Sequence, residues 1–298
     1  MRILKYTANI ARITALLAVV LTGMTSCQDV VDLELPDDDP IIIINGRISD
    51  TKGVFIDVLA SAPYFSNDSV PTINNAMVSL YQNNVLVGTV PEIPGRPGRY
   101  ASPFNGTEGN TYYIRVDIPN SDPYFPGTSW ESAPETMNRV FPIDSMYPKY
   151  LPADPPFQDE GYYIFMHFTE TPGKGDNYRL KLWRNDSLQG RPQDLTVFDD
   201  EFIDGLSFND SSQFGAFQLT GSPSVEGWTY RAELSSINLG YLDYITLLRQ
   251  QTLQVGSTFD PPPAPIVGNI YEAGNPKNFG LGYFAVSMLS SDSTVVEK

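Results

Sequence analysis

The segment Thr111-Tyr112-Tyr113-Ile114-Arg115-Val116-Asp117-Ile118 alternates between two kinds of side chain. Positions 112, 114, 116 and 118 are aromatic or aliphatic, and Arg115 and Asp117 lie between them. Successive side chains of a β-strand point to opposite faces, so this spacing predicts a strand with one face in a core. Short apolar or alternating runs precede it at 41–44, 54–59, 76–81, 85–87 and 99–101. Six or so strands at this spacing predict a β-sandwich over residues 41–136.

A second β-rich domain is expected at 161–298, after a proline-rich junction at 137–160 that is either a linker or a long loop between strands. Strands are expected at 162–169, 178–185, 228–234 and 282–289. One amphipathic helix is expected at about 235–251, because five apolar residues share one helical face after a serine that can cap it. These residues are Ile237, Tyr241, Tyr244, Ile245 and Leu248, with Ser235 or Ser236 as the cap. The predicted fold class is therefore mainly β.

The composition excludes several classes of function. The chain has 35 Asp and Glu residues against 19 Lys and Arg, a formal net charge of −16. Such a surface repels the phosphates of nucleic acids, so nucleic-acid binding is not expected. Cys27 is the only cysteine and His167 the only histidine, which leaves too few ligands for a structural zinc site and no internal disulfide. No glycine-rich phosphate loop is present, and no cofactor is expected.

Residues 1–26 have the parts of a secretory signal peptide. A basic start leads into an apolar run at 13–21, which is too short to span a membrane as a stable helix. The ending Met24-Thr25-Ser26-Cys27 resembles a bacterial lipobox, in which an apolar residue and two small residues precede the cysteine. This resemblance implies cleavage before Cys27 and attachment of acyl chains such as palmitate, which together anchor a protein durably. The alternative is an ordinary signal peptide with an incidental cysteine.

Residues 27–40 are expected to form an acidic tether between this anchor and the folded part. Asp37-Asp38-Asp39 keeps the tether solvated, while Pro36 and Pro40 stiffen it. Acidic residues close behind a lipidated cysteine resemble the signal that directs lipoproteins of the Bacteroidetes group to the outer face of the outer membrane. A localisation at the outer membrane, on its periplasmic or its outer face, is therefore expected.

An ordered set of short motifs resembles the Bacteroidetes lipoproteins grouped as domain of unknown function 4249 (DUF4249). The motifs are Asn45-Gly46, Ser61-Ala62-Pro63-Tyr64-Phe65, Gly98-Arg99-Tyr100, Gly109-Asn110-Thr111-Tyr112-Tyr113, Pro142-Ile143-Asp144-Ser145, Asp199-Asp200-Glu201-Phe202-Ile203-Asp204-Gly205, Gly268-Asn269-Ile270, Gly274-Asn275-Pro276 and Gly280-Leu281-Gly282-Tyr283-Phe284. The first segment also resembles immunoglobulin-like sandwiches of the transthyretin-like or carboxypeptidase-regulatory kind. The family resemblance implies an accessory role beside TonB-dependent outer-membrane receptors and supplies no catalytic residues.

Candidate binding residues come from two places in the second segment. Asp199, Asp200, Glu201 and Asp204 form its densest acidic group and offer weak candidates for calcium ligands, although they lack the spacing of an EF-hand and a solvated loop or capping role is the favoured alternative. Trp183 is the candidate for a ligand-binding aromatic, because strand alternation places it on the face of Arg179 and Lys181. Core packing is the alternative for each tryptophan.

Two further patterns concern catalysis and modification. His167 is expected to be a surface or packing residue, since no Gly-x-Ser-x-Gly turn presents a nucleophile. Four Asp-Ser sequences resemble the pattern at which Bacteroidetes O-glycosylate exported proteins, at Ser69, Ser145, Ser187 and Ser293.

The expected function is that of a non-enzymatic lipoprotein that captures a small ligand for a TonB-dependent uptake system. The first alternative is a structural or adhesin-like component of the cell envelope. The second is a hydrolase based on paired carboxylates, which only the positions of acidic side chains in space can identify.

Overall fold

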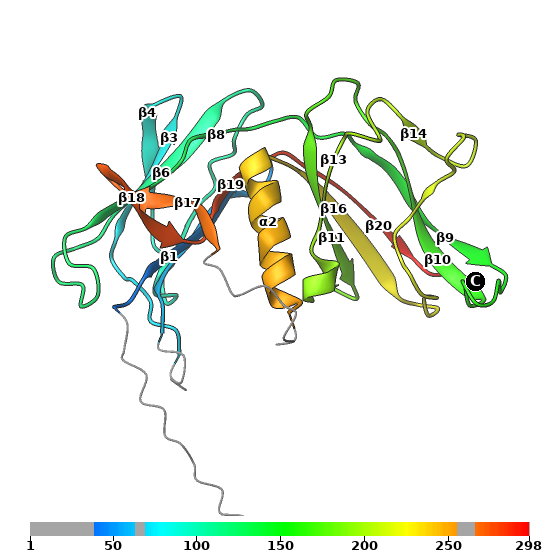
Figure 1. The fold of residues 1–298 in the computed structure, drawn as a ribbon, viewed down its shortest axis with the longest axis horizontal. Coiled ribbons are helices and arrows are strands. Elements are labelled where there is room, and N and C mark those ends of the chain that lie inside the picture. The colour runs from blue at the N-terminus through cyan, green and yellow to red at the C-terminus, as the bar shows by residue number, and fades with distance from the viewer. Residues whose placement is uncertain (1–38, 63–68, 255–265, 298) are drawn as a thin grey trace, which may run out of the picture. The chain divides into compact units, whose positions relative to one another are not determined.

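The computed structural model describes residues 39–62, 69–254 and 266–297 (Figure 1). These residues are mainly β-structure with one α-helix among them, as the sequence predicts. The predicted signal peptide, Cys27 and most of the tether lie outside the described residues. Within the described part, no helix has both the length and the apolar character that crossing a membrane requires.

The largest sheet has eleven strands and includes the strand that the sequence predicts most clearly. That strand is β6 (Thr111–Asp117), whose Tyr112, Ile114 and Val116 are at most 1% exposed, so the predicted inward face is confirmed. The other strands are β1 (Ile42–Ser49), β2 (Gly53–Ala60), β3 (Met77–Gln82), β4 (Val85–Val90), β5 (Arg99–Ser102), β7 (Ser129–Ser132), β8 (Glu135–Thr136), β17 (Val267–Glu272), β18 (Asn275–Leu281) and β19 (Phe284–Ser287). The path runs β4-β3-β6-β7-β17-β18-β1-β2-β5, with β19 on β1 and β8 on β6.

The two ends of this path are joined, so the sheet nearly closes on itself. Residues after β4 pair with β5: the amide of Ile93 donates to the carbonyl of Arg99 at 2.7 Å, and the amide of Ala101 donates to the carbonyl of Pro91 at 3.0 Å. Closure removes the exposed edges that an open sheet presents to other chains. The enclosed core includes Ile42, Ile44, Ile56, Tyr100, Tyr112 and Phe284.

Three strands of this sheet come from near the carboxyl end of the chain. β17 pairs with β7, β18 pairs with β17 and β1, and β19 runs parallel to β1. The predicted boundaries at 136 and 161 assign these strands to the second domain, whereas their hydrogen bonds place them with the first. Alternation identifies a strand and its buried face, but it does not name the partner strand, and only about two-thirds of consecutive strands pair or neighbour each other.

The second half contains two sheets with one apolar core between them. The second sheet consists of β9 (Ile143–Leu151), β10 (Gly161–Thr169), β14 (Ser207–Phe208) and β15 (Phe217–Gln218). The third consists of β11 (Asn177–Arg184), β12 (Ser187–Leu188), β13 (Thr196–Asp199), β16 (Thr229–Ile237) and β20 (Leu289–Val295), and a short 3-10 helix, η1 (Pro192–Asp194), lies between β12 and β13. The core includes Phe141, Met146, Ile164, Phe168, Tyr178, Leu234 and Val296.

The proline-rich junction contains a nine-residue strand, β9, which pairs along β10 from Leu151 to Ile143. Its amide at Met146 also donates to the carboxylate of Asp292 on β20 at 2.7 Å, which ties the second sheet to the third. The junction is therefore neither a linker nor a loop in this part. Pro142 and Pro148 made this segment resemble a linker or a loop. Pro148 is nevertheless tolerated within β9, because a missing N–H is costly only where it would bond to a neighbouring strand.

The helix exists as predicted but begins later than predicted. α2 spans Leu239–Thr252 with Asn238 as its N-cap, and strand β16 continues through Ile237. Ser235 and Ser236 do not cap the helix, because their hydroxyls donate to the carbonyls of Arg179 at 3.2 Å and Asn138 at 2.6 Å. Serine can serve either a cap or a neighbouring backbone, and here strand pairing takes both residues.

The inward face of β6 gives a direct test of the fold. Replacing Val116, which is fully buried, by alanine should lower the free energy of unfolding by about 2 kcal/mol, because it removes apolar contacts and leaves a small cavity. The same change at Val85, which is 67% exposed on β4, should alter it by less than about 0.5 kcal/mol. Urea unfolding of the two variants checks this, and equal effects would contradict the predicted inward face.

Candidate functional site

Strands β11 and β16 send alternate side chains to opposite faces of the third sheet. The inward set is apolar and belongs to the second core: Tyr178, Leu180, Tyr230, Ala232 and Leu234. Burying this set fixes which residues face outward, since a slip of one residue would move the whole set to the other face. The outward set is polar or charged, and it forms one wall of a groove.

The outward residues form three directly opposed cross-strand pairs. Arg179 lies opposite Ser235, Lys181 opposite Glu233, and Trp183 opposite Arg231. Directly opposed side chains on one face of an antiparallel pair lie close enough to interact. The guanidinium carbon of Arg231 lies 3.7 Å from the centre of the Trp183 ring, a cation–π contact.

The first sheet supplies the opposite wall. Arg47 comes from β1, and Lys52 comes from the turn that joins β1 to β2. We call the resulting depression the basic groove; its volume is about 230 Å³. Its charged and aromatic lining consists of Arg47, Lys52, Arg179, Lys181, Trp183, Glu233 and Tyr241.

Glu233 is the one carboxylate in this lining, and it is only 5% exposed. Lys52 forms an ion pair with it, and Lys181 and Arg231 each place a nitrogen 3.8 Å from one of its oxygens. A buried carboxylate is costly unless it is paired, so these three cations offset the desolvation of Glu233. Its single charge is thereby shared among them.

The crowding of positive charge is clearest at Lys181. Burial and, after it, the neighbouring charge of Arg179 lower the pKa of its ammonium to about 8, while Glu233 acts in the opposite direction. Arg47 and Lys52 also lower this pKa, which places both within electrostatic reach of Lys181. A negatively charged molecule in the groove would stabilise the protonated form.

Trp183 lies where the sequence places it, on the outward face with Arg179 and Lys181. It is partly buried, because Arg231 covers its ring. Trp130 and Trp228 pack in or against the two cores, as the core alternative expects. Whether Trp183 binds a ligand stays a prediction.

Sequence reasoning missed most of the basic groove. Arg47 and Lys52 precede Arg179 by more than a hundred positions, and Tyr241 comes from α2. Its hydroxyl accepts a hydrogen bond from Arg179, and its ring lies 5.5 Å from that guanidinium. β19 pairs with β1 and β20 pairs with β16, which brings Arg47 and Lys52 to the third sheet. No local motif encodes this pairing.

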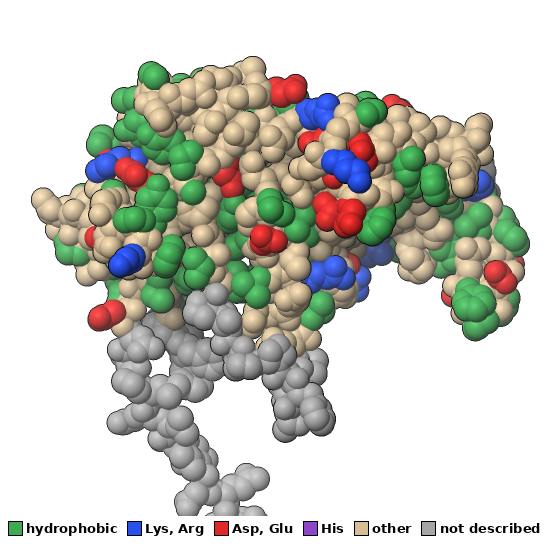
Figure 2. Space-filling view, turned by 45° about the horizontal axis from the view of Figure 1, so that its top comes forward, with side chains coloured by type: hydrophobic (Ala, Val, Ile, Leu, Met, Phe, Trp, Pro, Cys, Tyr) green, Lys and Arg blue, Asp and Glu red, His purple; other side chains and the backbone are tan. Residues whose placement is uncertain are grey.

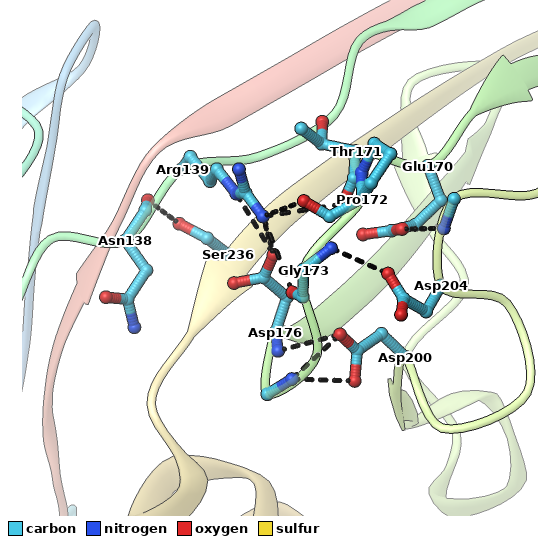
Figure 3. A network of polar contacts seen from close by, with 12 residues as sticks. Asn138, Arg139, Glu170, Thr171, Pro172, Gly173, Asp176, Asp200, Asp204 and Ser236 are labelled. Atoms are coloured by element: carbon cyan, nitrogen blue, oxygen red, sulfur yellow. Dashed lines mark hydrogen bonds and ion pairs between the residues drawn. The ribbon is translucent and has the colours of Figure 1, made fainter.

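A second cluster, of carboxylates, lies at the other end of β11 (Figure 3). Glu170, Asp176 and Asp200 each place an oxygen within 4.8 Å of the others. Their oxygens already accept hydrogen bonds: Glu170 from the hydroxyl of Tyr178 at 2.7 Å, Asp200 from the amide of Gly175 at 2.9 Å, and Asp176 from Arg139 at 3.1 Å. These bonds hold the loop between β10 and β11 in place, which accounts for the cluster without a metal ion.

Of the four predicted calcium ligands, only Asp200 belongs to this cluster. Asp204 accepts a hydrogen bond from the amide of Gly173 at 2.7 Å, and Asp199 accepts one from the amide of Glu201 at 3.1 Å. The structure therefore does not gather the four carboxylates at one point, because Asp199, Asp200 and Asp204 accept hydrogen bonds from different backbone amides. Calcium binding by these residues stays a prediction.

His167 lies on β10 directly opposite Ser145 of β9, in a polar network on the sheet surface. Its Nδ1 lies 3.3 Å from the Ser145 hydroxyl, and its Nε2 lies 3.1 Å from the Tyr147 hydroxyl and 3.3 Å from Asp210. The serine is in the middle of a regular strand rather than at a turn that would present it as a nucleophile. The network fastens the loop at Asp210 to the sheet, a packing role that agrees with the expectation for His167.

The predicted O-glycosylation serines lie at accessible positions. Ser69, Ser187 and Ser293 are exposed, and Ser145 is partly buried beside His167. Exposure is required for modification but does not demonstrate it, so these sites stay predictions.

A second, larger cavity of about 530 Å³ lies beside α2 and is lined by Glu135, Asp243, Tyr244 and Tyr283, among others. Glu135 is buried, accepts a hydrogen bond from the Tyr283 hydroxyl, and accepts another from Asn238 at 3.1 Å. Burial raises the pKa of Glu135 to about 7, although these hydrogen bonds oppose the rise. Because Asn238 is the helix N-cap, Glu135 connects β8, β19 and the start of α2.

The described chain is thus a mainly β protein whose third sheet carries a basic groove on the face opposite its core. A family model described as Domain of unknown function (DUF4249) matches residues 28–293, and the chain belongs to this family. The match confirms the resemblance that the ordered motifs indicate. A search of the curated proteins found nothing that matches this sequence.

The buried carboxyl of Glu135 predicts a specific pH dependence of stability. Its pKa is about 7 in the folded chain and near 4.5 when unfolded, so the folded state binds the proton more tightly. The contribution of the Glu135 carboxyl to the free energy of unfolding is fully present below pH 4.5 and is lost as the pH rises through 7. The loss amounts to about 3 kcal/mol, and Glu135→Gln, which is neutral throughout, should abolish it.

The measurement compares urea unfolding at pH 5 and pH 8. Wild-type chain should lose more stability over this interval than Glu135→Gln, while Glu108→Gln, at an exposed loop position, should behave like wild type. If Glu135→Gln keeps the full wild-type pH dependence, the raised pKa of Glu135 is wrong.

Proposed function

We propose that this chain is a lipid-anchored protein of the outer membrane of Bacteroidetes that captures a small ligand for a TonB-dependent receptor. The proposal includes no catalytic step. The nearly closed first sheet and the third sheet would together hold the ligand site. The anchor would be the acylated Cys27, and the acidic residues that follow would keep the folded part in solution.

The basic groove is the observation that carries the proposal. It gathers four cations and two aromatic rings in one depression, within a chain whose net charge is −16. Concave surfaces with a few polar groups of fixed orientation are typical of ligand sites. The cations come from β1, the turn after it and β11, whose strands are hydrogen-bonded into sheets, which holds such a site in a defined shape.

The lipobox and the tether support the proposed location at the outer membrane. An apolar run, two small residues and the only cysteine of the chain occur in the order that acylation requires. Diacylation together with an acylated amino terminus gives more than the single chain that binds membranes only weakly.

Lipid attachment is tested by metabolic labelling with palmitate in the native host. Wild-type chain should incorporate the label and partition with the detergent phase, whereas Cys27→Ser should lose both properties because the thiol is the acceptor. Ser26→Ala, which keeps a small residue before the cysteine, should retain them. Labelling of Cys27→Ser at the wild-type level would exclude this anchor.

The partner is tested by co-purification from outer membranes solubilised in a mild detergent. A carboxyl-terminal tag on the full chain should recover a TonB-dependent receptor in near-stoichiometric amount, and a tagged, unrelated outer-membrane lipoprotein should not. Recovery of no such receptor under conditions that preserve the anchor would count against a role in uptake and favour an envelope component.

A further inference from the structure

The basic groove concentrates positive charge to an unusual degree for this chain. Its lining holds four cations, Arg47, Lys52, Arg179 and Lys181, but one carboxylate, a net charge of +3. On the face that Figure 2 shows, acidic and basic side chains are scattered among a larger surface that is neither acidic nor basic. A local sign opposite to that of the whole chain would focus an anion toward this point.

Two of these cations form no ion pair with a carboxylate within the part of the chain that the structure describes, although Arg47 lies within electrostatic reach of Asp57. Arg179 contacts the hydroxyl and ring of Tyr241, and Arg47 lies 5.2 Å from the ring of Phe55. Contacts with aromatic rings leave most of the five N–H donors of a guanidinium free for other acceptors. Both side chains can therefore receive an oxyanion without breaking an ion pair.

The arrangement costs folding free energy. Burial, and after it the like charges nearby, lower the pKa of Lys181, so its protonated form is destabilised in the folded chain. Replacing one of these cations by a neutral residue would relieve the repulsion. A titrating group with a shifted pKa, in a depression lined by further cations, is typical of a site that binds a molecule of compensating charge.

We propose that the basic groove binds a small oxyanion with two or more negative charges, such as sulfate, phosphate or a polycarboxylate. The inference rests on the proposed function in that it names the class of the captured ligand. Guanidinium groups match the paired oxygens of these anions, which favours Arg47 and Arg179 as the direct contacts. A volume of about 230 Å³ is smaller than the sites that hold drug-sized molecules, so the anion is a small one.

Isothermal titration of the full acylated chain in neutral detergent tests the inference. Sulfate, phosphate and citrate are titrated separately at constant ionic strength set with sodium chloride, which screens non-specific attraction equally. At least one should bind more tightly than chloride. The arms separate an inorganic anion from a polycarboxylate, and binding of either kind supports the inference.

The variant Arg47→Gln/Arg179→Gln should weaken binding at least tenfold. It removes the cations that Glu233 does not use, so it leaves the partners of the buried carboxylate in place. Arg96→Gln, which makes the same change at an exposed loop residue, should bind like wild type. Failure of all three anions to bind, or wild-type affinity in the double variant, would overturn the inference.

A nuclear magnetic resonance measurement on the wild-type chain keeps the test independent of the double variant's folding. The bound anion should shift the indole N–H resonance of Trp183, which is assigned with Trp183→Phe. The resonance of Trp130, which lies in the first core, should not change. A shift elsewhere without one at Trp183 would place the anion at another site. Loss of receptor co-purification with intact anion binding would reject the uptake role and keep the site.

The titration of Lys181 adds a pH readout for sulfate, whose charge is constant. Affinity should fall severalfold between pH 7 and pH 9 as Lys181 loses its proton, and Lys181→Arg, which stays charged, should flatten the fall. The groups around Lys181 are Arg47, Lys52, Arg179, Arg231, Tyr241 and Glu233. A fall of equal size in Lys181→Arg would remove Lys181 from the site.

Discussion

One extended segment, Phe284–Val295, hydrogen-bonds to two different sheets, and the basic groove depends on it. Its first part, β19, pairs with β1 of the first sheet, and its second part, β20, pairs with β16 of the third. Only Met288 separates the two strands, and it is fastened by hydrogen bonds with Ser236 in both directions, at 3.0 and 2.9 Å. The first sheet, with Arg47 on β1, and the third sheet, with Arg179 and Lys181 on β11 beside β16, therefore meet along the same stretch of backbone.

This junction explains why a buried carboxylate is found beside so many cations. Glu233 lies where cations of both sheets approach, and an unpaired charge there would cost several kcal/mol. Lys52 of the first sheet and Lys181 of the third both reach it, so the ion pairs also connect the two sheets. Arg47 and Arg179 stand beside this arrangement without taking part in it. The cations that neutralise Glu233 are thus different from the cations whose charge is available to a ligand.

The sequence predicts those features of the fold that are determined by residues close together in the chain. Alternation located β6 with its buried face, and it placed Arg179, Lys181 and Trp183 together on the outward face of β11. The ordered motifs predicted the family, and the family model confirmed it. The helix start was wrong because Ser235 and Ser236 suit a cap or a strand equally, and packing decides between them. The groove was not predicted, because strand pairing brings Arg47 to β11 and the position of α2 brings Tyr241 there. Hydrophobic periodicity specifies neither.

The chain order of the first sheet has a consequence for synthesis. β17, β18 and β19 lie between β7 and β1 in space, yet they are the last strands of that sheet to be made. Until residue 287 has emerged from the ribosome, β1 and β7 each lack the neighbouring strands on one side, and the barrel cannot close. Such late, long-range pairing delays folding. Closure of the barrel therefore follows the synthesis of nearly the whole described chain.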